Sequence, residues 1–333
     1  MPKTNNYLKI IVVGYGSAGK RHVENLSKIP HIKIIILTKH EIKNKSSKII
    51  TVNSISKCIK EKPDAVIISN ETSNHVSYAI KFADAGLNLF IEKPLSNSFK
   101  DIKKIEKIIK EKNLITQMGC QLRFHKCIKE IKSLIIKKRI GKIISAKVEC
   151  GSYLPDWHSN ENYKKGYAAR DDLGGGVLLT CIHEIDYLYW FFGDVEEVIS
   201  ITGQYSNLKI SADDLSVGIL KFKNNIIAEF HLDYFQKSEF RSCKIIGTKG
   251  TIYWNSNSNI VKIYENVKKK WTEVLKRSKY ERNLMFKQEL MHFLECIKKQ
   301  KHTINPIEKD GITTLKIALG VKKSAKLRKM VKI

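Results

Sequence analysis

The sequence of 333 residues lacks the features that mark membrane, exported and zinc-binding proteins. It contains no run of 18 apolar residues, so we expect no membrane-spanning helix. The opening residues lack the apolar core of a signal peptide. The 7 cysteines are scattered, with no Cys-x-x-Cys pair and no cluster at zinc-ligand spacing. We therefore expect a cytoplasmic protein with free thiols and no metal site.

Acidic residues are also scarce: 33 Asp and Glu stand against 60 Lys and Arg, and the formal net charge is +27. A basic chain of this kind can bind nucleic acid. However, the charge comes mostly from lysine and is spread along the whole chain, and the longest run is Lys268–Lys270. We rank nucleic-acid binding last among the alternatives and expect the charge to favour anionic small molecules.

Strand-like and helix-like segments alternate over the first 120 residues. Short apolar segments predict buried strands at 8–13, 32–37, 65–69, 88–91 and 114–118, and the first of these is a β-branched run. Helices are predicted between them at 18–28, 54–60, 74–85 and 99–112. Repeated β-α-β units form parallel sheets through right-handed crossovers. We predict an α/β fold with a Rossmann dinucleotide-binding domain at 1–122, whose ligand lies at the carboxyl ends of the strands.

The pattern changes in the second part of the chain, where strand-like runs follow one another without regular helices between them. These runs lie at 143–148, 195–204, 215–222, 226–232, 241–247 and 250–253. Helices are predicted at 177–192, 281–299 and 311–326. We predict a second domain at 123–333, an α+β domain with a large, mostly antiparallel open sheet, which binds the substrate. The last segment, 305–326, is expected to pack back near the cleft.

The motif Gly14-Tyr15-Gly16-Ser17-Ala18-Gly19 stands between the first predicted strand and the first helix. In this context the first glycine allows a tight turn, and the second lets the backbone approach a pyrophosphate. The third lets the helix pack closely on the strand. The N–H groups at the start of the helix then bind the anion. The motif predicts a dinucleotide site, and the alternative is a glycine-rich turn without a ligand.

A second signature follows the fourth predicted strand, which ends in Glu92-Lys93-Pro94-Leu95. A lysine at this edge of a parallel sheet lies where ligands bind. In other contexts such a lysine is a solvated residue at a turn. Here it is predicted to lie beside the cofactor crevice.

Six stretches together resemble the glucose–fructose oxidoreductase / inositol dehydrogenase / rhizopine-catabolism family, written Gfo/Idh/MocA. They are 12–19, 67–75, 92–95, 119–124, 174–179 and 183–186. The resemblance implies a nicotinamide-dependent oxidoreductase that acts on a sugar, sugar phosphate or nucleotide-sugar. It implies that Lys93 and His183 are catalytic. It also implies a homodimer or homotetramer formed through the exposed sheet face.

The physical chemistry of the two residue types agrees with these roles. Oxidation of a secondary alcohol needs a base for the hydroxyl proton, and histidine has a reference pKa of about 6.5. A lysine ammonium can donate a hydrogen bond to the reacting oxygen. The cofactor is expected to contact Gly14, Tyr15, Gly16, Ser17, Ala18, Gly19, Thr38, Lys39, Asn70, Thr72, His75, Glu92 and Lys93.

The sequence departs from the family at one place. Many members have an aspartate a few residues before the catalytic histidine, whereas here Thr180 is the nearest polar residue before His183. A hydroxyl can orient a substrate but cannot act as a carboxylate. The departure leaves a second hypothesis open, that of a non-catalytic NAD(P)-binding sensor or regulator with the same fold.

Polar and aromatic residues between predicted strands form a candidate substrate loop. Aromatic faces with Arg and Asp nearby suit a sugar ring that bears anionic groups, and the alternative is an ordinary surface loop. The expected substrate contacts are Arg123, Tyr153, Trp157, Tyr167, Arg170, Asp172 and Thr180.

The choice between NAD and NADP depends on the end of the second predicted strand. A carboxylate there would bind the ribose hydroxyls of NAD. The chain instead has Thr38 and Lys39, and the first carboxylate is Glu41. A hydroxyl followed by a lysine can accept a 2′-phosphate, so this segment slightly favours NADP.

Overall fold

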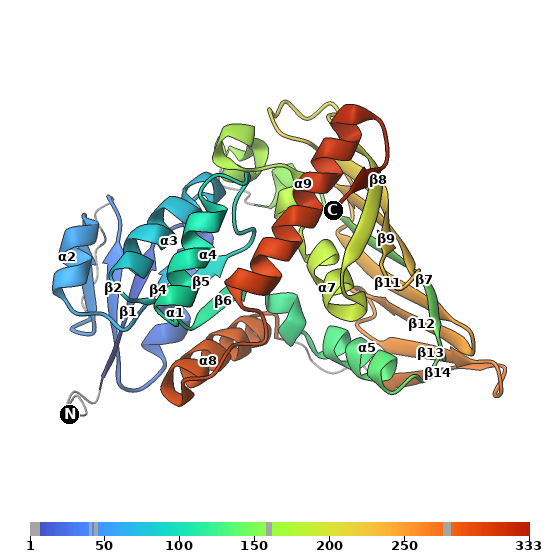
Figure 1. Cartoon of the computed structure of the whole chain (residues 1–333), viewed down its shortest axis with the longest axis horizontal. Helices are drawn as coiled ribbons and strands as arrows, with labels where there is room; N and C mark the ends of the chain where they lie inside the picture. Colours follow the sequence, from blue (N-terminus) through green and yellow to red (C-terminus); the bar gives the residue numbers. More distant parts are fainter. Residues whose placement is uncertain (1–6, 40–41, 43–45, 158–161, 276–280) are drawn as a thin grey trace. The chain divides into compact units, whose positions relative to one another are not determined.

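The structure is a computed structural model that describes residues 7–39, 42, 46–157, 162–275 and 281–333. It divides into two compact units (Figure 1). One comprises the chain up to Gly119 together with Lys287–Ile312, and the other comprises Cys120–Phe286 and Thr313–Ile333. The predicted division at residue 122 treats each domain as contiguous and so differs from the structure, in which a late segment of the chain returns to the first unit.

The first unit contains a six-stranded parallel sheet in the order β3-β2-β1-β4-β5-β6. Its strands are β1 (Leu8–Val13), β2 (Ile32–Leu37), β3 (Ile49–Val52), β4 (Ala65–Ile68), β5 (Asn88–Glu92) and β6 (Thr116–Gly119). Its helices include α1 (Ser17–Ser27), α2 (Ile55–Lys60), α3 (His75–Asp84) and α4 (Ile102–Glu111). The strand order reverses between β1 and β4, which is the point where such sheets bind ligands. This unit confirms the predicted Rossmann fold and adds β3.

Helix α8 (Asn283–Lys299) explains why a late segment belongs to the first unit. Its apolar residues Phe293 and Leu294 are buried with Ile10, Ile67 and Phe90 in one core cluster. Phe293 packs edge-on against Phe90, with 5.6 Å between the ring centroids. This burial of large apolar side chains stabilises the return of the chain.

The second unit contains a nine-stranded sheet in the order β14-β13-β12-β11-β7-β10-β9-β8-β15. All pairings are antiparallel except that of β7 with β10. The strands are β7 (Ile143–Gly151), β8 (Val195–Gly203), β9 (Leu215–Phe222), β10 (Ile227–Asp233), β11 (Phe240–Gly247), β12 (Gly250–Asn255), β13 (Val261–Glu265), β14 (Lys270–Leu275) and β15 (Val331–Lys332). The predicted open sheet is confirmed, with β13 and β14 added at one edge.

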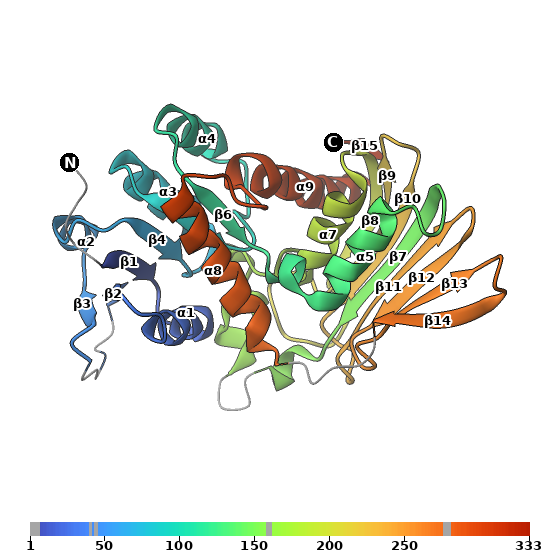
Figure 2. The same cartoon turned by 90° about the horizontal axis from the view of Figure 1, so that it is seen from below.

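One face of this sheet is covered by helices, as Figure 2 shows. They are α5 (Lys126–Ile136), α6 (Val177–Thr180), α7 (His183–Phe192) and α9 (Ile312–Leu327). The predicted helix at 177–192 is thus two helices, separated by a turn at Cys181 and Ile182. No helix of the described residues covers the opposite face in Figures 1 and 2.

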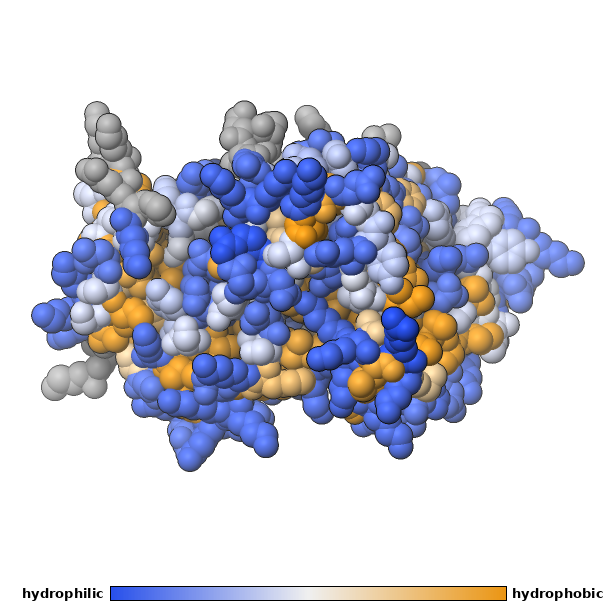
Figure 3. All heavy atoms as spheres, turned by 90° about the horizontal axis from the view of Figure 1, so that it is seen from above, coloured by the Kyte–Doolittle hydropathy of each residue, from blue (hydrophilic) through white to orange (hydrophobic). Residues whose placement is uncertain are grey.

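Among the described residues, none of the helices is both long enough and apolar enough to cross a membrane. Hydrophilic residues dominate the face of the molecule drawn in Figure 3, with hydrophobic residues in patches between them. The hydrophilic residues are spread over that face and do not gather in one place, which agrees with the spread of lysine along the sequence.

Candidate functional site

The glycine motif forms the turn from β1 into α1. Gly14 has φ +85°, and a Cβ there would lie 3.0 Å from the backbone of Asn70. A Cβ on Gly19 would lie 2.2 Å from the Gly14 carbonyl oxygen. These two glycines are therefore required for the turn itself.

Gly16 differs from the other two glycines because a Cβ there would meet nothing within 4 Å. Gly16 is the residue before the first turn of α1, and no side-chain cap of that turn is found in the described part of the chain. The side-chain oxygen Oδ1 of Asn70, buried after β4, has no hydrogen-bond partner within the described part of the chain. An open cradle at a helix N-terminus beside an unsatisfied polar atom fits a dinucleotide phosphate and amide.

Other predicted cofactor residues lie in the same unit with different exposures. Thr38 and Thr72 are buried, whereas Lys39 and Ser17 are exposed. The ammonium of Lys20 lies 5.8 Å from the centroid of the Tyr15 ring. The neighbours of Lys39 in the sequence, His40 and Glu41, lie outside the described residues, so the structure does not describe the first carboxylate after β2.

Lys93 follows β5 and is half-buried. Glu92, the residue before it, accepts a hydrogen bond from Nε2 of His22 at 2.7 Å. Burial by itself would raise the pKa of Glu92, but the hydrogen bond and charge of His22, together with Lys93, hold it below its usual range. Glu92 is thus an anion beside the predicted catalytic lysine.

His183 is the first residue of α7 and is buried. Its Nε2 accepts a hydrogen bond of 3.0 Å from the side-chain amide of Gln121, which lies in the same unit. An imidazole nitrogen that accepts a hydrogen bond carries no proton, so it can accept one from a substrate hydroxyl. Gln121 belongs to the stretch at 119–124, yet its sequence position gives no signal of contact with His183.

Arg123, predicted to contact substrate, is only 1% exposed. Its Nε and Nη2 donate to the two carboxylate oxygens of Asp186 at 2.9 and 2.8 Å. The guanidinium also lies over the Trp190 ring, 5.6 Å from the centroid. The observed role of Arg123 is to join the segment after β6 to α7 within the second unit, and its contact with substrate stays a prediction.

A second buried charge lies next to His183 in the sequence. The Nε of Arg241 on β11 lies 2.7 Å from the carboxylate of Glu184, and its Nη2 lies 3.1 Å from the Cys150 sulfur. A hydrogen bond from Cys181 and the charge of Arg241 lower the pKa of Cys150 to about 6, against the effect of burial. Sequence reasoning missed Arg241 because it lies far from Glu184 along the chain.

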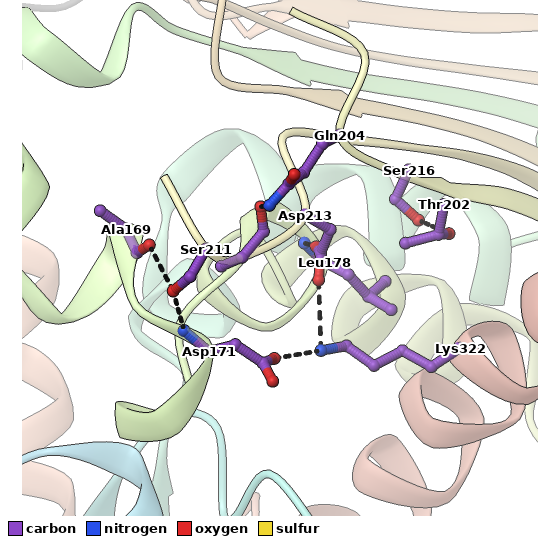
Figure 4. Close-up of polar contacts among 10 residues, drawn as sticks. Ala169, Asp171, Leu178, Thr202, Gln204, Ser211, Asp213, Ser216 and Lys322 are labelled. Atoms are coloured by element: carbon purple, nitrogen blue, oxygen red, sulfur yellow. Dashed lines mark hydrogen bonds and ion pairs between the residues drawn. The ribbon is translucent and has the colours of Figure 1, made fainter. Parts of the chain in front are cut away.

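The glycine-rich segment before His183 is held by Asp213, as Figure 4 shows. Its carboxylate accepts from the Leu178 N–H at 3.0 Å, and its carbonyl oxygen accepts from the Val177 N–H at 2.8 Å. Lys322 of α9 lies 3.2 Å from the Asp213 carboxylate and 3.6 Å from that of Asp171. A Cβ on Gly176, which has φ +100°, would lie 2.5 Å from the Asp213 carboxylate. Asp213 therefore caps α6 and excludes a side chain at Gly176.

Two aromatic residues of the predicted substrate loop contact other residues of the second unit. The indole N–H of Trp157 donates to Ser152 at 2.9 Å, and the ring packs edge-on against Tyr234. The Lys237 ammonium lies 3.1 Å from the centroid of the Tyr153 ring. These contacts occupy part of both aromatic side chains.

The other predicted substrate contacts differ in exposure. Arg170 and Asp172 form an exposed ion pair with each other, and the Tyr167 ring is 39% exposed. Thr180 is buried in α6. The structure brings all of these residues into the second unit, and their contacts with a substrate stay predictions.

Each of the two parts of the chain matches a known family model. Residues 8–120 match the family model described as "Oxidoreductase family, NAD-binding Rossmann fold", and residues 128–253 match the "GFO/IDH/MocA C-terminal domain". A curated relative is the scyllo-inositol 2-dehydrogenase (NAD(+)) of Bacillus subtilis. It is 24% identical over an alignment that covers 94% of this chain and 92% of the relative.

Solved structures share the fold over nearly the whole chain. Levoglucosan dehydrogenase in complex with NADH has a TM-score of 0.87 at 17% identity, with 98% of this chain and 99% of that chain covered. The myo-inositol 2-dehydrogenase of Lactobacillus plantarum has a TM-score of 0.80 at 25% identity, with 98% and 99% covered.

Proposed function

Because the chain belongs to the Gfo/Idh/MocA family of oxidoreductases, we propose that it transfers hydride between a nicotinamide cofactor and a secondary hydroxyl of a carbohydrate. The observation that carries this proposal is the glycine turn, where Gly16 faces open space and the buried side-chain oxygen of Asn70 has no partner among the residues that the structure describes. When bound, a nicotinamide ring supplies the hydride acceptor or donor.

In this proposal His183 and Lys93 act on the reacting hydroxyl. In the oxidation, the hydroxyl proton goes to Nε2 of His183 while hydride leaves the same carbon, and a carbonyl forms. The hydroxyl replaces the Gln121 amide on Nε2, which the hydrogen bond between these two side chains supports. The Lys93 ammonium donates a hydrogen bond to the oxygen as negative charge develops on it.

The relatives bear on the cofactor. The printed name of the scyllo-inositol dehydrogenase gives NAD(+), and the levoglucosan dehydrogenase structure holds NADH. They lend no support to the preference for NADP that Thr38 and Lys39 suggested. We propose NAD as the cofactor, and titration with NADH and NADPH, followed by nicotinamide fluorescence, tests it. Tighter binding of NADPH would contradict this choice.

We base the proposed substrate class on the names of the relatives, which refer to inositol, levoglucosan and anhydrofructose. We propose a polyhydroxylated ring, with sugar phosphates and nucleotide-sugars as the anionic candidates that the net charge of +27 supports. In this proposal Tyr167, Arg170, Asp172 and Thr180 contribute to the substrate surface. A panel of neutral and anionic sugars, assayed with the preferred cofactor, tests this point.

Single substitutions distinguish an enzyme from a sensor. In an enzyme, Lys93→Met and His183→Asn lower kcat by at least a hundredfold while the protein still binds NADH. The matched control is Lys100→Met, because Lys100 is an exposed lysine of the same unit. A wild-type protein that binds NADH but turns over no member of the panel would favour the sensor.

We also propose that a second copy of the chain covers the open face of the nine-stranded sheet. The register places Ile199 beside Ile219 and Ile201 beside Val217, and these three isoleucines are 40–60% exposed. Such an uncovered apolar patch fits a partner surface. Ile201→Lys with Ile219→Lys should convert a dimer or tetramer to monomers in sedimentation, and a wild-type monomer would refute the proposal.

A further inference from the structure

The two residues that flank Lys93 are each held by a buried histidine. Glu92 precedes Lys93 and contacts His22 of α1, whereas Pro94 follows it and contacts His75 of α3. His22 and His75 are 3% and 1% exposed, so both contacts lie inside the first unit. Lys93 itself stays half-buried between these two fixed points.

His22 joins Lys93 to the helix that carries the glycine turn. Its Nε2–H donates to Glu92 Oε1 at 2.7 Å, and its ring packs edge-on against Phe90, 5.2 Å between centroids. The side chains of His22 and Glu92 are only 4% and 14% exposed. A charge-assisted hydrogen bond with so little water around it holds its partners in one geometry.

His75 joins Lys93 to the loop after β4. Its Nδ1 lies 2.8 Å from the Pro94 carbonyl oxygen, and its Nε2 lies 3.1 Å from the Asn70 carbonyl oxygen. A neutral imidazole has one N–H, so it can donate to only one of two carbonyls. Burial lowers the pKa of His75 even though both hydrogen bonds and the charges of Glu92 and Glu71 oppose this. The contact of Nδ1 with Pro94 is the shorter of the two, so we take Nδ1 as the nitrogen that donates.

The 2.8 Å contact of His75 with Pro94 fixes the backbone beside Lys93. Asn70, the other partner of His75, packs on Gly14, where a Cβ would meet its backbone at 3.0 Å. His75 thus lies between Lys93 and the loop that borders the glycine turn.

We propose that His22 and His75 are positioning residues that fix Lys93 against the cofactor turn by holding Glu92 and Pro94. The inference rests on the proposed role of Lys93 in hydride transfer. A displacement of about 1 Å in a reacting group can cost about a hundredfold in rate. Loss of either contact should therefore act on kcat far more than on the KM for the substrate.

The test compares His75→Leu, which donates no hydrogen bond, with His75→Gln, whose amide can still donate to Pro94. We expect kcat to fall at least tenfold in His75→Leu and to recover at least half of this loss, on a logarithmic scale, in His75→Gln. Because both ring nitrogens of His75 contact backbone carbonyls, the dissociation constant for NADH should change by less than threefold. The matched control is His31→Asn, because His31 is exposed and has φ 58°, which asparagine tolerates.

The contact of His22 is tested by a double-mutant cycle with His22→Leu and Glu92→Gln. If the two residues act through one contact, the double variant should have a kcat no lower than the worse single variant. Fully multiplicative losses would overturn this part of the proposal. A lowered melting temperature with unchanged kcat would show a structural role alone, and would overturn it as well.

A readout without turnover separates this inference from the proposed function. Reductive ¹³C-methylation gives Lys93 an NMR signal, which Lys93→Arg identifies. The chemical shift of this signal should change in His75→Leu and not in His31→Asn. If wild-type protein turns over no substrate, the proposed function fails, while an unchanged chemical shift overturns the positioning role independently.

Discussion

Arg123 and Asp186 form a two-pronged ion pair in the interior of the second unit, with 2.9 and 2.8 Å between the paired nitrogen and oxygen atoms. Their side chains are 0% and 2% exposed. Thr314 also donates to the Asp186 carboxylate, at 3.4 Å. These contacts join the segment after β6, helix α7 and helix α9, which are far apart in the sequence. Asp186 lies on α7, the helix that begins with His183.

Removal of one partner should destabilise the protein strongly. Arg123→Met leaves the Asp186 carboxylate buried without its guanidinium, which typically costs about 3–5 kcal/mol. Thermal unfolding measures the loss. The control is Arg139→Met, because Arg139 pairs with Glu265 at 40% exposure and its loss should cost below about 1 kcal/mol. Equal shifts in melting temperature for the two variants would contradict the prediction.

Gly16 and Gly19 of the turn should respond differently to alanine. Gly16→Ala places a methyl group in open space, so the fold should persist while NADH binding weakens at least tenfold because the methyl group blocks the phosphate. Gly19→Ala places a Cβ 2.2 Å from a backbone oxygen and should impair folding. Melting temperature and NADH fluorescence separate the two effects. Unchanged NADH affinity in Gly16→Ala would argue against a phosphate at this turn.

The burial of His125 predicts that the protein loses stability in acid. Burial, with the positive charge of Arg241, lowers its pKa to about 4. Between pH 6.5 and 4 the His125 side chain binds a proton in the unfolded chain but not in the folded one. The contribution of His125 to the free energy of unfolding therefore falls as the pH falls through this window, and it does not change further below it. The cost is about 3 kcal/mol. His125 accepts from the Cys127 N–H, which asparagine can replace. His125→Asn should flatten the pH dependence of the melting temperature, and a slope equal to wild type would refute this.

Asp213 and Lys322 allow the cap of α6 to be separated from its ion pair. Asp213→Ala removes the acceptor for the Leu178 N–H and should cost about 1–2 kcal/mol. Asp213→Asn keeps an acceptor, and Lys322→Met removes only a partly exposed ion pair, so each should cost less than about 1 kcal/mol. Thermal unfolding ranks the three variants, and Lys326→Met on the same helix is the control. A Lys322→Met loss as large as that of Asp213→Ala would contradict this order.

Local sequence patterns predicted much of the fold. Apolar runs identified β1, β2, β4 and β5, because a strand buried on both faces needs an unbroken apolar run. The short β3 was missed, since its Thr51 and flanking polar residues break such a run. The break between α6 and α7 was missed because nearly every residue from 177 to 192 is buried, and periodicity does not reveal a turn inside a buried segment.

The candidate site also has features that the sequence predicted and features that it did not. The glycine turn and Lys93 could be found from the sequence, since both depend on residues that are adjacent along the chain. The partners of these residues could not be found. His22 and Glu92 are 70 residues apart, and Gln121 and His183 are 62 residues apart. Arg123 looked available to a substrate in the sequence, whereas its guanidinium is buried against Asp186.

The sequence by itself determined the fold class, the family and the turn that fits a dinucleotide, because backbone sterics and burial patterns act over a few residues. The tertiary structure decided which charges are buried, which nitrogen of His183 contacts Gln121, and which unit residues 287–312 join. Those outcomes depend on contacts between distant segments, and their free energy comes from packing and desolvation that no local pattern contains.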